Sequence, residues 1–242
     1  MAGGLQIAYR FTPGGGPAIV FLPGYMSDME GGKATAVFDW AREQGRACLL
    51  MDYSGCGQSS GQFAEGALSR WKDEVIEMIA RFLPDRDVVL VGSSMGGWLM
   101  LLAGLILDKR LAGLVGIAPA PDFTEWGYDA EQKAALKRGQ TIFEENEYGP
   151  DPTPTHALFW ADGQANLLLD SGDIAIACPV RILQGQQDPD VPWGTSLRLA
   201  EALRSDDVQV TLIKDGDHRL SRDEDIALLL DLITSLPSKR TP

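Results

Sequence analysis

The stretch "VLVGSSMGGWLM", residues 89–100, joins an apolar run typical of a buried strand to one typical of a buried helix. Between the two runs, Gly92 to Gly96 fit the pattern G-x-S-x-G with Ser94 at its centre, in the strand–turn–helix context that the pattern requires. A serine at the tip of so tight a turn has a strained backbone, and only very small flanking residues let strand and helix pass so closely. The stretch therefore predicts an exposed nucleophile at Ser94.

A simpler interpretation of the same residues is a helix cap. Serine side chains often accept hydrogen bonds from the first N–H groups of a helix, so Ser93 and Ser94 could serve only to start the helix at residue 95. The five-residue pattern does not separate the two interpretations, and the choice depends on which residues stand at the ends of the other strands.

Several apolar runs resemble residues 89–100 and predict a parallel sheet covered on both faces, because each is continuous, of strand length and ends near Gly, Pro or Asp. The predicted strands are 18–24, 46–52, 87–93, 111–119, 179–185 and 208–215. Helical stretches are expected between them at 33–44, 66–83, 95–108, 193–204 and 222–235. Strand alternating with helix predicts an α/β fold with a doubly wound, mostly parallel sheet.

The segment from about 121 to 172 interrupts this alternation, because it contains no evident sheet strand. It is too long for a structureless connection, so we expect one domain over residues 1–242 with a lid-like insertion. A charged helix is predicted at 129–140 and a hairpin around Asp162-Gly163. The aromatic residues of the insertion suit either an apolar acyl group or the packing of a lid on the sheet. They are Phe123, Trp126, Tyr128, Phe143, Tyr148, Phe159 and Trp160.

Composition excludes several classes of partner. The chain has 242 residues and a formal net charge of −13, which disfavours binding to nucleic acid and to anionic lipid. No apolar run reaches the ~18 residues of a membrane span, and the first residues lack the features of a signal peptide. The three widely spaced cysteines fit reduced thiols, so a cytoplasmic protein is expected. They are Cys48, Cys56 and Cys178.

No motif predicts a cofactor or a metal ion. The glycine-rich stretch "SGCGQSSG", residues 54–61, has Ser60 where G-x-G-x-x-G requires its last glycine, and neither a P-loop nor H-E-x-x-H is present. Asp215, Asp217 and His218 form an acidic turn that is expected to be solvated, because side chains so close in sequence rarely converge on one metal.

Polar residues follow the carboxyl ends of three predicted strands, where ligands collect in open α/β sheets. Ser94 follows the third strand, Asp188 the fifth and His218 the last, and this order favours a nucleophile, an orienting acid and a base. Asp190 is the competing acid. Neighbours two apart in an extended loop point to opposite sides, so only one is expected to face His218. Pro189 restricts the backbone of Asp188 and favours it, leaving Asp190 solvated or capping the next helix.

An oxyanion hole is expected from backbone N–H groups. Met95 begins the helix after the nucleophile, and Tyr25 lies in the loop after the first predicted strand. The chain has only two histidines, and His156, in the insertion, is interpreted as structural or, alternatively, as a contact in the binding pocket.

Taken together, these motifs resemble the α/β-hydrolase family over roughly residues 15–235. The stretches that carry the resemblance are "FLPGYMSDM", "DYSGCGQSSG", "GSSMGGWLML" and "LQGQQDPDVPW" followed by "KDGDHR", and they are similar to the subfamily of acyl-protein thioesterases and acyl-glucuronide esterases. The resemblance implies that Ser94, Asp188 and His218 form a triad acting on acyl esters or thioesters. Pro23 departs from the family, because many members have histidine at this position before Gly24.

The expected function is therefore a serine esterase or thioesterase acting on a small-molecule or acylated substrate. A serine peptidase of the same fold is an alternative that the acids Glu144, Glu145 and Glu147 do not decide, and a catalytically silent binding protein is a more distant one. The leaving group, the length of the acyl chain and the oligomeric state are not predicted.

Overall fold

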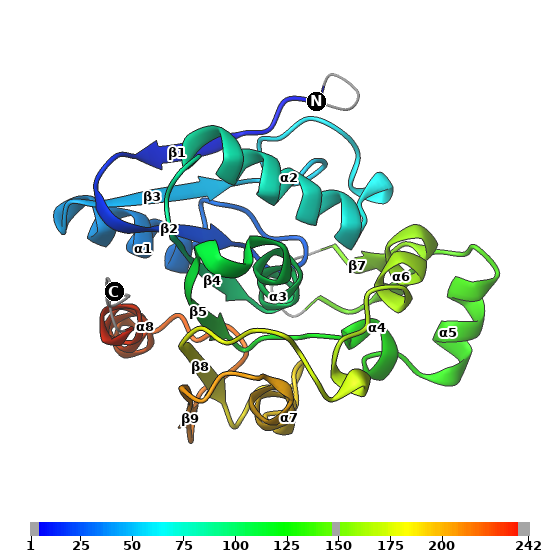
Figure 1. Ribbon diagram of the computed structural model, residues 1–242. Helices are drawn as coiled ribbons and strands as arrows, with labels where there is room; N and C mark the ends of the chain where they lie inside the picture. The colour runs from blue at the N-terminus through cyan, green and yellow to red at the C-terminus, as the bar shows by residue number, and fades with distance from the viewer. Residues whose placement is uncertain (1–4, 147–150, 237–242) are drawn as a thin grey trace.

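A seven-stranded sheet forms the centre of the computed structural model, which describes residues 5–146 and 151–236 (Figure 1). The strands lie in the order β1-β3-β2-β4-β5-β8-β9. Strand β1 is antiparallel to β3, and the other neighbouring pairs of this sheet are parallel. The bounds are β1 Tyr9–Thr12, β2 Gly15–Leu22, β3 Arg46–Met51, β4 Val88–Ser93, β5 Leu111–Ile117, β8 Val180–Gly185 and β9 Val208–Ile213.

Helices cover both faces of the sheet, and one apolar cluster lies on each face. Helices α1 (Gly32–Glu43) and α8 (Asp223–Ser235) contribute to the cluster on one face. Helices α2 (Leu68–Phe82), α3 (Met95–Leu107) and α7 (Gly194–Ala202) contribute to the other. Almost all of α3 is buried, as its unbroken apolar sequence predicts. The predicted doubly wound α/β fold is confirmed.

The predicted strands and helices agree with the structure to within a few residues at their ends, and one strand of the central sheet was missed. Strand β1 is four residues long, lies at the edge of the sheet and is partly exposed. Its residues Tyr9, Arg10, Phe11 and Thr12 make no continuous apolar run. A short, half-exposed edge strand therefore lacks the pattern that identifies buried parallel strands.

The segment between β5 and β8 has secondary structure of its own and lies at one end of the molecule (Figure 1). Its elements are α4 (Phe123–Trp126), α5 (Ala130–Lys137), β6 (Ile142–Glu144), β7 (Thr153–Thr155), α6 (Ala157–Gln164) and a 3-10 turn at Leu169–Ser171. Strands β6 and β7 form a separate antiparallel pair. The predicted charged helix at 129–140 corresponds to α5, whose start is closed by a reciprocal capping box between Asp129 and Gln132.

The predicted hairpin around Asp162-Gly163 is wrong, because both residues lie within α6. The Asp162 carboxylate accepts a hydrogen bond of 2.7 Å from the N–H of Ser69 at the start of α2. A Cβ at Gly163 would lie 2.6 Å from the side chain of Thr124, so the glycine permits close packing of α6 on α4. Tertiary contacts thus give these two residues roles that differ from those of an Asp-Gly turn.

Candidate active site

The turn between β4 and α3 has the strained geometry that the opening stretch predicts. Ser94 stands at its tip with φ 53° and ψ −120°, which is unusual for a residue with a side chain. A Cβ at Gly96 would overlap the backbone carbonyl of Leu22, and one at Gly97 would lie 2.6 Å from Pro119. The glycines therefore let α3 cross against β2 and the loop after β5.

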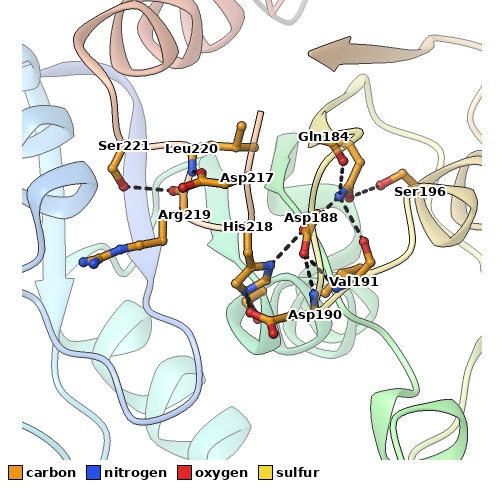
Figure 2. Close-up of polar contacts among 12 residues, drawn as sticks. Gln184, Asp188, Asp190, Val191, Ser196, Asp217, His218, Arg219, Leu220 and Ser221 are labelled. Atoms are coloured by element: carbon orange, nitrogen blue, oxygen red, sulfur yellow. Dashed lines mark hydrogen bonds and ion pairs between the residues drawn. The ribbon is translucent and has the colours of Figure 1, made fainter. Parts of the chain in front are cut away.

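Ser94, His218 and Asp188 form one hydrogen-bonded row at the carboxyl ends of β4, β9 and β8. The Nε2 atom of His218 lies 3.1 Å from Ser94 Oγ, and its Nδ1 atom lies 2.9 Å from Asp188 Oδ2. The side chain of Asp188 is fully buried, whereas the imidazole retains 15% exposure toward the cavity. The structure thus brings together the three side chains that the sequence predicts as nucleophile, base and acid. Figure 2 shows the imidazole of His218 against the Asp188 carboxylate.

The Asp188 carboxylate is held by four donors. Its Oδ1 atom accepts hydrogen bonds from the backbone N–H groups of Asp190 and Val191, at 2.9 and 2.8 Å. Its Oδ2 atom accepts one from the side-chain amide of Gln184, at 3.0 Å, besides its contact with His218. Sequence reasoning missed Gln184; its only signal was a polar residue near the end of a buried strand that also contains Arg181.

Asp190 also approaches the imidazole, contrary to the expectation that only one of the two carboxylates faces it. Its Oδ2 atom lies 4.0 Å from Nε2 of His218, while Asp188 contacts Nδ1. The ring thus stands between both carboxylates. The suggestion that Asp190 caps α7 is wrong, because that helix begins after Trp193 without a side-chain cap. The Asp190 side chain is 47% exposed, so it remains in contact with solvent.

The acidic residues before His218 have partners of their own. Asp215 pairs with Arg222 at 2.9 Å, and Asp217 accepts the backbone N–H of Leu220. Among the described residues, ligand atoms of Asp188, Asp190 and His218 do lie within 4.8 Å of one another. The hydrogen bond between Asp188 Oδ2 and His218 Nδ1 joins two of these three side chains.

The two backbone groups predicted for the oxyanion hole flank the nucleophile. Met95 is the first residue of α3, and Tyr25 lies three residues after the end of β2. A Cβ at Gly24 would lie 3.3 Å from the Cβ of Ser94, so the loop carrying Tyr25 passes close to the serine. The buried hydroxyl of Tyr53 donates to the Pro23 carbonyl at 3.1 Å and fixes this loop from behind.

The side chain of Tyr25 points away from the serine into the insertion. Its hydroxyl donates to the carbonyl of Pro154 at 3.0 Å, and its ring lies 4.7 Å from the ring of Phe159. Burial raises the pKa of the Tyr25 phenol well above its usual range. The residue therefore joins the loop after β2 to the insertion and keeps its hydroxyl protonated.

A cavity of about 700 Å³ opens over Ser94 and His218. Aromatic side chains of the insertion form one part of its wall: Phe123, Trp126 and Tyr128. Acidic and basic side chains also line it: Asp28, Glu144, Glu145, Asp190, Lys33 and Arg219. The cavity thus has an aromatic part contributed by the insertion and a charged part that includes the loop of His218.

The other predicted aromatic residues have different surroundings. Phe159 is buried against Trp71 of α2, Trp160 is buried within the insertion, where its indole donates to the Thr124 carbonyl, and Phe143 is 65% exposed. Tyr148 lies outside the described residues, as does Glu147. His156 Nδ1 forms a 2.9 Å hydrogen bond with the hydroxyl of Thr141, and its ring lies edge to face with the ring of Phe63. These contacts fit the structural interpretation of His156.

Lys33 connects α1 to the loop that carries the candidate base. Its ammonium donates to the backbone carbonyl of Arg219 and lies 3.3 Å from the hydroxyl of Ser221. Burial lowers the pKa of Lys33 to about 8. The loop of His218 is thus tied to a helix on the opposite side of the cavity from the insertion.

Comparison with known proteins gives one consistent family. Residues 19–231 match the model described as "Alpha/beta hydrolase family". The human protein named "Palmitoyl-protein thioesterase ABHD10, mitochondrial" is 36% identical over 97% of this chain and 77% of its own length, and its Mus musculus counterpart is 38% identical over 97% and 80%.

Solved structures agree with that result. A structure described as a putative hydrolase from Agrobacterium vitis S4 has a TM-score of 0.88 and 40% identity, covering 96% of this chain and 92% of that one. Mouse alpha/beta hydrolase domain-containing protein 10 has a TM-score of 0.89 and 35% identity, covering 98% and 95%. Within the described ranges, no helix has the length and apolarity that crossing a membrane requires.

Proposed function

Because the chain belongs to the alpha/beta hydrolase family, we propose that it cleaves acyl esters or thioesters through an acyl-enzyme on Ser94. The observation that carries this proposal is the hydrogen-bonded row from Ser94 Oγ to His218 and on to Asp188, at 3.1 and 2.9 Å. The strained turn that exposes the serine supports the same role.

In the proposed first half-reaction, His218 Nε2 accepts the hydroxyl proton as Ser94 Oγ attacks the acyl carbonyl carbon. The negative charge that develops on the carbonyl oxygen accepts hydrogen bonds from the backbone N–H groups of Tyr25 and Met95. The imidazolium then gives its proton to the departing oxygen or sulfur, and the bond to the leaving group breaks. Asp188 holds Nδ1–H and so fixes the tautomer that leaves Nε2 free to accept.

The second half-reaction repeats these roles with water. His218 removes a proton from a water molecule, which attacks the acyl-enzyme carbonyl and restores the oxyanion. Collapse of this intermediate breaks the bond to Ser94 Oγ, returns the proton from the imidazolium to the serine and releases the carboxylic acid.

The cavity suggests how a substrate lies. A departing atom must come within hydrogen-bond reach of His218 Nε2, so the leaving group occupies the charged part of the cavity beside this loop. We propose that the acyl chain extends the other way, along Phe123 and Trp126. An apolar acyl group is consistent with the relatives named palmitoyl-protein thioesterases. The insertion then serves as the lid over the acyl site.

The cellular location stays a prediction. A cytoplasmic protein is expected from the three widely spaced cysteines, whereas the names of the similar animal proteins include "mitochondrial".

The test is a substrate screen with the purified protein. Acyl esters and acyl thioesters of increasing chain length should be cleaved with kcat/KM well above that for aminoacyl-anilides, and a fluorophosphonate probe should label the protein once. A clear preference for anilides would instead support the serine peptidase. Absence of turnover on every substrate, with no labelling, would support the silent binding protein.

A further inference from the structure

A buried polar network continues behind Asp188, beyond the three residues of the proposed triad. Gln184 is the fifth residue of β8 and Ser196 lies on α7, and neither side chain is exposed. The Ser196 hydroxyl donates to Gln184 Oε1 at 2.9 Å, and Gln184 Nε2 donates to Asp188 Oδ2 at 3.0 Å. Figure 2 shows Gln184 between Ser196 and Asp188, with His218 on the far side of the carboxylate.

The surroundings of Gln184 fix which end of its amide faces the carboxylate. The backbone carbonyls of Gly185 and Val191 lie 3.2 and 3.3 Å from Nε2, and carbonyl oxygens can only accept. Nitrogen therefore belongs at this end of the amide. The opposite end, Oε1, takes its hydrogen bond from Ser196. The amide is held at both ends and presents an N–H to Asp188.

Packing alone does not require an amide at this position. The neighbouring β8 residues Ile182 and Leu183 are apolar and fully buried, and a buried amide destabilises the fold unless each of its polar atoms is paired. Leucine or methionine would fill a similar volume without that requirement. What the amide adds is a donor to Oδ2, the oxygen that also accepts from His218.

That donor restricts how the carboxylate can turn. The N–H groups of Asp190 and Val191 hold Oδ1, and the amide holds Oδ2 on the side away from the imidazole. Without the amide, Oδ2 would have His218 as its only partner, and the carboxylate could rotate about its bond to Cβ. Outer hydrogen bonds of this kind orient the groups that carry chemistry.

Building on the proposed function, we propose that Gln184 is a positioning residue: supported by Ser196, it holds the Asp188 carboxylate in the orientation that His218 needs. The row of hydrogen bonds then runs from Ser196 through Gln184, Asp188 and His218 to Ser94. Gln184 contacts no substrate, so it acts on the rate through Asp188 and not on substrate binding.

Gln184→Met tests this role, since methionine keeps the length of the side chain and removes the donor. We expect kcat for an acyl ester to fall ~10- to 30-fold with KM within ~2-fold, because the altered orientation matters in the transition state and not in substrate binding. Ser196→Ala should lower kcat less, by ~3-fold. The matched control is Thr195→Val, which changes a buried residue on the same helix and should leave kcat within ~2-fold.

A double-mutant cycle separates positioning from a general loss of structure. If Gln184 acts through Asp188, adding Gln184→Met to Asp188→Asn should lower kcat by less than ~2-fold further. An equal loss in both backgrounds would overturn the proposal, as would full kcat in Gln184→Met. Where circular dichroism shows that Gln184→Met does not fold, Gln184→Leu replaces it: this variant also fills a similar buried volume and removes the donor, so kcat should fall at least as far. Unchanged kcat in Gln184→Leu would likewise overturn the proposal.

A failure of the positioning role can be distinguished from a failure of the proposed function. The proposed function is tested first: the wild type should cleave an acyl ester and Ser94→Ala should not. Within an enzyme that meets this criterion, unchanged kcat in the Gln184 variants removes the positioning role and leaves the triad in place.

Discussion

Two regions enclose the cavity, and they are held together in different ways. On one side, Ser94, Asp188 and His218 each follow the end of a sheet strand, where backbones approach so closely that glycine is required at Gly96. On the other, the insertion between β5 and β8 consists of short helices and a two-stranded sheet joined by side-chain contacts. The three side chains of the candidate site are therefore positioned by the backbone of the sheet, whereas the cavity wall that the insertion contributes is positioned by side-chain packing.

Ser94→Ala should have the largest effect on activity, because the proposed reaction takes place on this side chain. Removing the nucleophile is expected to lower kcat for an acyl ester by at least ~10⁴-fold and to abolish fluorophosphonate labelling, because Oγ forms the covalent bond. Ser93→Ala is the matched control and should keep labelling and turnover. Labelling that persists in Ser94→Ala and disappears in Ser93→Ala would show that the wrong serine has been assigned.

Asp188→Asn against Asp190→Asn tests the two carboxylates on the imidazole. Asparagine at 188 favours the wrong tautomer of His218, so kcat should fall by at least ~10²-fold, whereas Asp190→Asn should cost less than ~10-fold. The difference follows from burial and contact: Asp188 is buried at 2.9 Å from Nδ1, and Asp190 is half-exposed at 4.0 Å from Nε2. Steady-state kinetics on folded variants gives both values, and the opposite ranking would reassign the acid.

The strand ends could be predicted because their sequence signals are local. Apolar runs that end in Gly or Asp place Ser94, Asp188 and His218 at one edge of a parallel sheet wherever the connecting helices lie. The role of Gln184 could not be found in this way, since its partner Ser196 comes from α7 and no spacing links the two. The approach of Asp190 to Nε2 depends on how the loop after β8 folds around the Asp188 carboxylate.

The insertion was harder to predict for a related reason. Asp162-Gly163 carries a turn signal, yet its carboxylate bonds to α2 and its glycine packs against α4, both of which are distant in sequence. The aromatic residues show the same limit: Phe123 and Trp126 line the cavity while Phe159 packs inside, although all three are aromatic residues of the same insertion. Side-chain packing decided these outcomes, and the sequence pattern does not encode it.

Glycine-to-alanine substitutions should destabilise the fold more at the close backbone contacts of the sheet than in the insertion. Gly96→Ala should destabilise the fold by more than ~3 kcal/mol, because its Cβ would overlap the carbonyl of Leu22 and neither backbone can move easily. Gly139→Ala, in the insertion, should cost only ~1 kcal/mol, since its φ of +81° is strained for alanine but the space around it is open. Urea unfolding measures both, and equal losses would contradict the contrast.

The burial of Cys48 in the sheet should make the stability of the fold depend on pH. Burial raises the pKa of the Cys48 thiol on β3 to about 12, although Arg46 and Arg10 act in the opposite direction. Because the pKa of this thiol is higher in the folded chain than in the unfolded chain, the contribution of Cys48 to the free energy of unfolding is fully present below pH ~9. It is lost as the pH rises toward ~12.

Cys48→Ala should therefore be less stable than the wild type at pH 7.5, because it leaves a small cavity, and the gap should narrow by about 1 kcal/mol at pH 10. Urea unfolding at both pH values gives the two gaps. A gap of the same size at both would show that the thiol does not titrate differently in the folded and unfolded chain.

Trp126→Ala tests the insertion as the wall of the acyl site and should have the smallest effect. Trp126 lines the cavity from α4, and its indole is anchored by a 2.8 Å hydrogen bond to the carbonyl of Pro121. If long acyl chains lie against the ring, its removal should raise KM for them ~3- to 10-fold, corresponding to the partial loss of an apolar contact, with little change for an acetyl ester.

Phe143→Ala is the matched control for Trp126, because Phe143 is an aromatic residue of the same insertion that is 65% exposed and lies outside the cavity wall. It should leave KM unchanged for every chain length. An equal rise in KM for acetyl and long-chain esters in Trp126→Ala would mean that the tryptophan shapes the geometry around Ser94, so that the insertion also helps to place the reacting atoms. No rise for any ester would place the acyl chain along a different wall and remove the aromatic part of the cavity from substrate selection.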